Sequence, residues 1–169
     1  MAREAFAEQG PDVTFEEIVR LSGLGVGTLY RHFPSRDALI EAMYLAEVER
    51  LVEAEREISA AEPPVEALRQ WMRLFVEFMA TKSALKRSFA GLGSGNDCLY
   101  TQTTELITSA MNRLTQRAVG TGELWIGVEP IDLLRALSGV AHATDDATAT
   151  ENALRMVDIL IAGLRTGPR

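Results

Sequence analysis

Apolar residues recur at intervals of three and four along the whole chain, and no stretch sustains the alternation of a half-buried strand. The pattern therefore predicts an all-α protein. Breakers divide it into segments, because proline cannot continue a helix and glycine favours a turn. The clearest division is Pro63-Pro64, which follows a long helix expected to begin after Ser35 and to reach about Ile58.

Eight or nine helices follow from these divisions. Their expected ranges are 3–8, 15–22, 26–33, 36–58, 67–79, 85–89, 97–120, 130–142 and 151–164. Two of them begin with typical capping residues. Thr14 and Glu17 form a capping box, and Ser35 can cap the helix that follows it. The polar stretch 143–150 is predicted to be a loop.

The segments 15–22 and 26–33, joined by a glycine-containing turn, have the proportions of a helix-turn-helix. Val26, Leu29 and Phe33 share one side of the second helix, where they would pack inward. A major groove requires a short helix with hydrogen-bonding groups near its tip. The residues on the other side that meet this need are Gly27, Thr28, Tyr30, Arg31 and His32. A generic amphipathic hairpin with a solvated Arg31 would show a similar pattern, so this alternative stays open.

Charge and composition limit the classes of protein and the cellular location that fit this sequence. The chain of 169 residues has a net charge of −7, yet residues 23–36 hold two arginines and a histidine with no acid. An acidic protein can still dock on DNA through such a locally basic segment. No secretory signal and no apolar run long enough to span a bilayer is visible, and the single cysteine, Cys98, excludes an internal disulfide. We therefore expect a cytoplasmic protein without membrane association.

The stretch TFEEIVRLSGLGVGTLYRHFPSRDALIEAMY, residues 14–44, resembles the DNA-binding domain of the TetR family of bacterial transcriptional regulators. The run GVGTLYRHFPSRDAL carries the strongest likeness. The resemblance implies a helix-turn-helix domain over residues 1–44 and a second domain over residues 45–169. The residues that it places against DNA bases or phosphates are Thr14, Gly27, Thr28, Tyr30, His32 and Arg36, and the pattern above adds Arg31. The expected first helix is shorter than is usual in the family, which would remove phosphate contacts and weaken DNA binding.

Residues 63–169 more faintly resemble the C-terminal domain of the SbtR-like group of the same family, in the phrases WMRLFVEFMATK and DLLRALSGVAHA. The resemblance implies a helical pocket for a small-molecule effector and a dimer interface made by the last two helices. Candidate pocket residues are Trp71, Phe75, Phe78, Met79, Phe89, Tyr100, Met111 and Trp125. Candidate interface residues are Leu134, Leu137, Leu154, Val157, Leu160, Ile161 and Leu164. Two plainer interpretations stay open: the aromatic residues could be ordinary core, and a monomeric core could cover the last helix.

The hypothesis that follows is a ligand-responsive regulator, most simply a repressor, that binds a palindromic DNA operator as a homodimer. A long fourth helix would join its two domains. The alternative is a helical small-molecule-binding protein without effective DNA binding. An all-α enzyme is disfavoured because no acid, base or metal-ligating groups converge in the pattern. No cofactor or metal is expected, since the chain has two histidines and its GLGSG run follows no strand.

Overall fold

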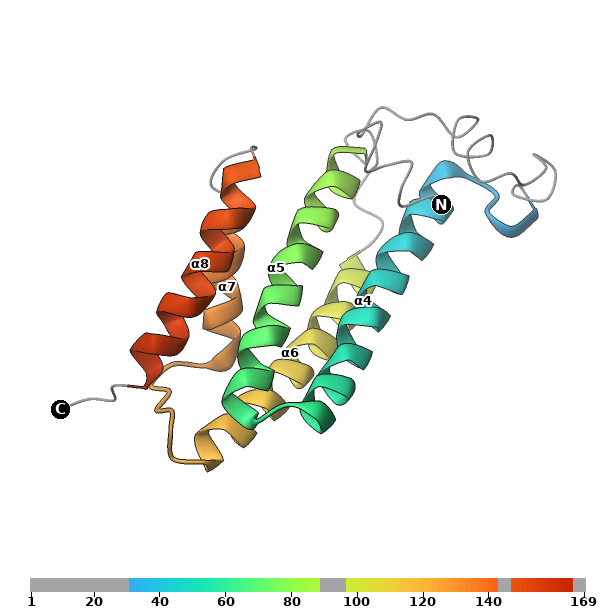
Figure 1. Ribbon diagram of the computed structural model, residues 1–169. Helices are drawn as coiled ribbons and strands as arrows, with labels where there is room; N and C mark the ends of the chain where they lie inside the picture. The colour runs from blue at the N-terminus through green and yellow to red at the C-terminus, as the bar shows by residue number, and fades with distance from the viewer. Residues whose placement is uncertain (1–30, 89–96, 143–146, 166–169) are drawn as a thin grey trace. The chain divides into compact units, whose positions relative to one another are not determined.

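The computed structural model describes residues 31–88, 97–142 and 147–165, and these ranges form five helices without a strand (Figure 1). The all-α expectation is therefore confirmed for this part of the chain. The helices are α4 (Arg36–Ala61), α5 (Pro64–Ser88), α6 (Asp97–Gly120), α7 (Pro130–Ala141) and α8 (Ala147–Leu164). The expected helices over 3–8 and 15–22, and most of the one over 26–33, lie outside the described residues.

The chain divides into two compact units. Unit 1 comprises residues 1–47 and 81–95, and unit 2 comprises residues 48–80 and 96–169. The first division lies close to the expected boundary at residue 44. The assignment of 81–95 to unit 1 was not expected from the sequence. It arises because α5 runs antiparallel to α4, so the end of α5 lies beside the beginning of α4: the Lys82 Nζ atom lies 5.6 Å from the centre of the buried Tyr44 ring.

Helix α4 begins where the sequence predicts. The Ser35 side-chain oxygen accepts a hydrogen bond from the backbone N–H of Ala38 at 3.1 Å, and the Ser35 carbonyl accepts one from Leu39 at 3.2 Å. The serine therefore satisfies a backbone donor in the first helical turn that has no partner within the helix. At the other end, α4 stops before the Pro63-Pro64 pair, and Pro64 is the first residue of α5.

Helix α5 is one continuous element, which corrects the expectation of a separate short helix over 85–89. The segment 80–88 contains no glycine or proline, so nothing in it forces the backbone out of the helix. The division between the two units falls at this place, after Ala80.

The ends of α6 and α7 confirm the expected turn chemistry. Helix α6 stops at Gly120, and Gly122 then adopts a positive φ of 76°, a conformation that costs glycine little because it has no Cβ atom. The backbone N–H of Gly122 bonds to the Val119 carbonyl at 2.9 Å. Pro130 is the first residue of α7, after an extended Glu129, as the steric restriction on a residue before proline requires.

Helix α8 begins at Ala147, four residues earlier than the predicted start at Glu151. Its buried side begins with Ala149 and continues through Ala153, Val157 and Ile161 at intervals of four. Alanine makes a weak apolar signal, and the threonines around Ala149 gave the segment a loop-like appearance. The burial of Ala149 and Ala153 shows that the segment belongs to the helix.

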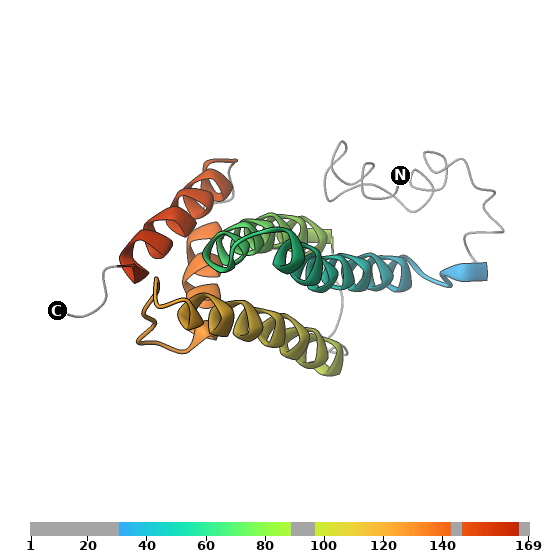
Figure 2. The ribbon, with the colours of Figure 1, turned by 60° about the horizontal axis from the view of Figure 1, so that its bottom comes forward.

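The core of unit 2 is built from the second half of α4 together with α5, α6, α7 and α8. The Trp71 indole N–H on α5 donates to the Leu51 carbonyl on α4 at 2.9 Å, inside the core. Helices α7 and α8 lie side by side in both ribbon views (Figures 1 and 2). The fully buried large side chains in the interior are Val48, Leu68, Trp71, Met72, Val76, Met111, Leu114, Leu137, Val157 and Ile161.

The first prediction concerns Trp71. Trp71→Phe removes the buried N–H donor and some packing volume, and should lower the free energy of unfolding by about 1–3 kcal/mol. The chain supplies its own control, because Trp125 is 52% exposed and Trp125→Phe should change stability by less than about 0.5 kcal/mol. Urea unfolding followed by circular dichroism measures both. Equal effects of the two substitutions would contradict the structural role given to Trp71.

Candidate nucleic-acid interface and bundle core

Two of the predicted DNA-contacting residues, Arg31 and His32, end the helical segment just before α4, and both are exposed. Phe33 next to them is half-buried, and its ring centre lies 6.4 Å from that of His32. Hydrophilic side chains therefore face solvent at this position, while the adjacent aromatic ring turns partly inward. The other candidates on this segment and before it, Thr14, Gly27, Thr28 and Tyr30, lie outside the described residues.

The remaining candidate, Arg36, is the first residue of α4. A helix N-terminus carries unpaired backbone N–H groups and the positive end of the helix dipole, which together favour an anion such as a phosphate. Ser35 fixes this N-terminus through its hydrogen bond to Ala38. Arg31, His32 and Arg36 thus lie within six consecutive residues at the start of a helix with a defined cap.

The candidate pocket residues of α5 are all buried in unit 2. Trp71 and Phe75 stack with ring centres 6.2 Å apart, and Phe75 and Phe78 follow at the same distance. Met79 on α5 and Met111 on α6 are also buried. These five residues therefore belong to the core, which agrees equally with a pocket wall and with ordinary packing.

The other three pocket candidates differ. Phe89 lies outside the described residues, and Tyr100 lies in the first turn of α6. Trp125 does not join the core, because it lies in the connection between α6 and α7 at 52% exposure, with its ring over Gly127. Its backbone N–H donates to the Leu164 carbonyl at 2.9 Å, so the residue caps the end of α8.

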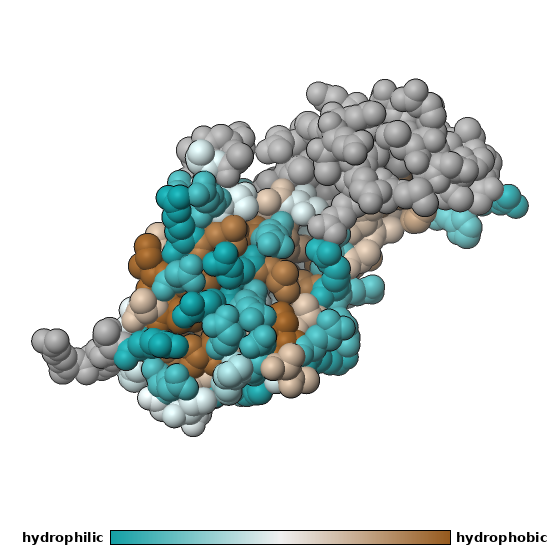
Figure 3. Space-filling model, in the orientation of Figure 1, coloured by the Kyte–Doolittle hydropathy of each residue, from teal (hydrophilic) through white to brown (hydrophobic). Residues whose placement is uncertain are grey.

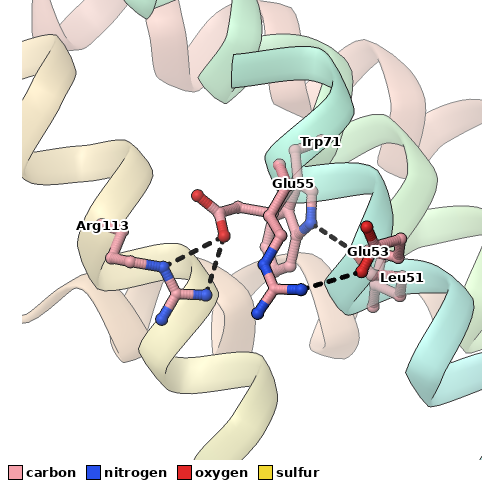
Figure 4. Close-up of polar contacts among 6 residues, drawn as sticks. Leu51, Glu53, Glu55, Trp71 and Arg113 are labelled. Carbon is pink, nitrogen blue, oxygen red and sulfur yellow. Dashed lines mark hydrogen bonds and ion pairs between the residues drawn. The ribbon is translucent and has the colours of Figure 1, made fainter. Parts of the chain in front are cut away.

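The sequence reasoning missed a charged group in the bundle, Glu55. Its side chain is 6% exposed, and one carboxylate oxygen accepts hydrogen bonds from Nε and Nη2 of Arg113 at 3.0 and 2.7 Å (Figure 4). A signal for this burial exists in the sequence, because Glu55 continues the spacing of the buried residues Tyr44, Val48 and Leu51. One turn further, Arg117 donates to the Ser59 carbonyl at 3.0 Å.

Two threonines of α6 are the other buried polar residues in the described ranges. Thr103 is 1% exposed and Thr115 is 5% exposed, and the Thr115 hydroxyl has no hydrogen-bond partner in the protein. By contrast, the polar residues Gln116 and His142 are exposed, and the His142 ring lies against the Ser138 carbonyl at the end of α7. Thr115 therefore brings a hydroxyl group without a hydrogen-bond partner into the interior.

The candidate interface residues separate into two groups. Leu134, Leu137, Val157 and Ile161 are buried within the single chain, where α7 packs on α8. They are covered within their own chain, and the interface that the resemblance implies stays a prediction. Leu154, Leu160 and Leu164 are half-buried. The large apolar side chain that α8 exposes is that of Ile159, at 62%.

Known proteins share both parts of this arrangement. Residues 1–43 match the family described as bacterial regulatory proteins, tetR family, and residues 63–166 match the SbtR-like C-terminal domain of transcriptional regulators. A solved TetR transcriptional regulator from Streptomyces coelicolor is 38% identical, with a TM-score of 0.83, covering 97% of this chain and 94% of that chain. A TetR transcription regulatory protein from Mycobacterium vanbaalenii is 30% identical, with a TM-score of 0.76, covering 97% and 90%.

A curated relative matches over a shorter stretch. An HTH-type transcriptional regulator of Staphylococcus aureus is 41% identical over 51 residues, which span 28% of this chain and 27% of that protein. The chain belongs to the TetR family of bacterial transcriptional regulators, a family of DNA-binding regulators and not of enzymes. In the ranges that the structure describes, no helix has the length and apolar character to cross a bilayer, and no three potential metal ligands gather.

The second prediction concerns the buried carboxylate. Arg113→Met keeps an apolar stem but leaves Glu55 without its partner, and should lower the free energy of unfolding by about 1–3 kcal/mol. The loss stays below that of a fully enclosed pair because the Arg113 side chain is 49% exposed.

The matched control is Arg56→Met, which breaks the exposed Glu53–Arg56 pair (side chains 58% and 71% exposed) drawn beside it in Figure 4. It should cost less than about 0.5 kcal/mol. Thermal and urea unfolding compare the two variants. If Arg113→Met costs no more than this surface pair, the buried ion pair does not hold α6 to α4.

Proposed function

We propose that the protein is a ligand-responsive transcriptional repressor that binds a palindromic operator as a homodimer. One observation carries the DNA-binding part of the proposal. Arg31 and His32 are exposed just before the capped start of α4, inside the segment that matches the tetR family. An effector bound by unit 2 would then favour a conformation of the dimer that no longer fits the operator, which requires a coupling free energy of about 1–3 kcal/mol.

Each DNA-facing side chain has a chemical role in this proposal. Arg31 can donate two hydrogen bonds to a guanine edge or contact a phosphate, and His32 can donate to a phosphate. Arg36 at the N-terminus of α4 would hold a phosphate, where the helix dipole adds to its charge. Thr14, Gly27, Thr28 and Tyr30 complete the proposed surface, with Gly27 allowing the backbone to approach the groove closely.

The outer face of α8 supports the homodimer. Ile159 is exposed, and a Cβ atom added at Gly163 one turn later would meet nothing within 4 Å, so both positions face open space in the single chain. Together with Asn152 and Met156 they follow the alternating four- and three-residue spacing of a helix–helix seam. Figure 3 shows hydrophobic surface on the α8 side of unit 2, bordered by hydrophilic side chains. An isologous contact would bury this stripe against its own copy.

The effector part of the proposal rests on the core of unit 2. Its aromatic row, Trp71, Phe75 and Phe78, offers apolar contact, and the unpartnered Thr115 hydroxyl offers a hydrogen bond. A mostly apolar site with few polar groups is typical of small-molecule sites. We therefore propose a largely apolar effector that carries a hydrogen-bonding group.

The third prediction tests operator binding. Arg31→Ala should weaken binding to the operator by about 10- to 100-fold, the loss expected for one base-reading arginine. The operator is first located by selection from genomic fragments, starting with the region upstream of the gene itself, and affinity is measured by fluorescence anisotropy. Arg56→Ala removes another exposed arginine, one that belongs to unit 2, and serves as the control.

Two outcomes would contradict this proposal. The first is a wild-type protein that binds no genomic fragment more tightly than random duplex, which would favour the alternative of a small-molecule-binding protein without effective DNA binding. The second is an Arg31→Ala variant that loses the dimer as well, because the arginine would then act through folding or assembly.

The fourth prediction tests the dimer. Ile159→Glu places a charge in the centre of the proposed seam and should convert a dimer to a monomer in analytical ultracentrifugation. The introduced glutamate lies four residues after Arg155, where the pair is acceptable on an exposed helix face, so the single chain should stay folded. Leu106→Glu on α6 introduces the same charge at a residue 49% exposed and should leave the dimer intact. A dimer that survives Ile159→Glu would place the interface elsewhere.

A further inference from the structure

Positive charge is unevenly distributed between the two parts of unit 1. Residues 1–47, which contain the proposed DNA-reading segment, carry four basic and eight acidic side chains. Residues 81–95 carry three basic side chains and no acidic one, namely Lys82, Lys86 and Arg87. Unit 1 as a whole therefore has a net charge of −1, whereas its first part alone has −4. Unit 2 carries ten basic and sixteen acidic side chains.

Lys82, Lys86 and Arg87 lie on the last turns of α5. These turns pack beside the first turns of α4. Lys82 is level with Tyr44, because its Nζ atom lies 5.6 Å from the centre of that ring. The helices are antiparallel, as the contacts Trp71–Leu51 and Lys82–Tyr44 together require. Lys86 and Arg87 therefore follow in the direction of Arg36, the first residue of α4.

The distance that remains along the helix axis is short. With a rise of about 1.5 Å per residue, Lys86 is level with residue 40, roughly 6 Å from the start of α4. Adding the spacing of about 8–10 Å between the axes of packed helices, the two segments lie roughly 10–12 Å apart. A duplex carries one phosphate charge per about 1.7 Å of its axis, so it presents phosphates to both segments at once. A polyanion at the start of α4 would thus be attracted by the end of α5 as well.

We propose that the end of α5, through Lys86 and Arg87, is a second phosphate-attracting segment of the DNA-binding unit. It offsets the acidity of residues 1–47 and adds sequence-independent affinity for duplex DNA. The inference rests on the proposed function, and it adds a segment that the helix-turn-helix signature does not contain. Because phosphate attraction carries no sequence information, it should strengthen binding to operator and random DNA alike.

The experiment uses the salt dependence of binding to a random duplex of 30 base pairs, followed by fluorescence anisotropy of a labelled strand. Lys86→Ala with Arg87→Ala should reduce the slope of log affinity against log salt concentration by between about one and two, since each lost phosphate interaction contributes about 0.9. Affinity at 50 mM salt should fall by about ten-fold, and the difference from wild type should shrink towards 200 mM.

The matched control removes two arginines from α4 in unit 2. Arg50→Ala with Arg56→Ala changes the net charge by the same amount, but Arg50 lies about 21 Å along the helix from Arg36, more than twice the Debye length of about 8 Å. The control should retain the wild-type slope. Lys86→Arg with Arg87→Lys should also retain it, because both charges are kept. If the alanine pair alters the circular dichroism spectrum, Lys86→Gln with Arg87→Gln replaces it.

The outcomes separate the two proposals. A wild-type protein that shows no salt-dependent binding to duplex DNA overturns the proposed function, and this inference with it. A wild-type protein that binds, with an unchanged slope for the Lys86 and Arg87 variants, overturns the second segment alone. So does an equal loss of slope in the Arg50 and Arg56 control, because net charge and not its position would then be responsible.

Discussion

The buried carboxylate of Glu55 constrains how the helices of unit 2 can pack. A charged group removed from water requires an opposite charge and hydrogen bonds, and Arg113 supplies both. Arg117 reaches the Ser59 carbonyl one turn further along both helices, so α6 runs parallel to α4 in a single register. The Trp71 indole N–H donates to the Leu51 carbonyl of α4 and holds α5 against it. Any shift of α4 would break these polar contacts together, whereas apolar packing alone would tolerate some sliding.

The same helix α4 links the charge distribution to the fold. It begins at Arg36, next to exposed Arg31 and His32, and it ends among the acidic residues of unit 2. The net charge of −7 therefore hides a division, since unit 2 carries −6 and unit 1 only −1. A chain that would repel DNA on average can present a nearly neutral unit with a basic edge to the phosphates.

The apolar residues of helix α8 divide between packing within the chain and the proposed dimer contact. Its side facing α7 contains Val157 and Ile161 and is fully covered within the chain. Asp158 is tied to Arg73 at 3.2 Å and to Arg69 at 3.6 Å, which fixes α8 against α5. With two sides of the helix committed in this way, exposed Ile159 and Gly163 lie on the side that is left for a partner in the proposed dimer.

The all-α class, most helix boundaries in the part of the chain that the structure describes, and the family membership could be determined from the sequence, because they depend on local properties. Ser35, the Pro63-Pro64 pair, Gly122 and Pro130 act within one or two turns of the backbone, and the GVGTLYRHFPSRDAL run is contiguous. Five pocket candidates are buried, as their helical spacing indicates, while their part in a pocket stays a prediction.

The tertiary structure decided what depends on neighbours distant in sequence. It placed Arg113 beside Glu55 across 58 residues, placed the exposed Trp125 at the end of α8, and covered Leu134, Leu137, Val157 and Ile161 within the chain. It also grouped residues 81–95 with residues 1–47 in unit 1. Periodicity states which side of a helix is apolar, but not which element covers it. Which element covers the apolar side depends on how whole helices pack. This packing decided which residues lie in the interior, which lie on the surface, and which are left for the proposed interface.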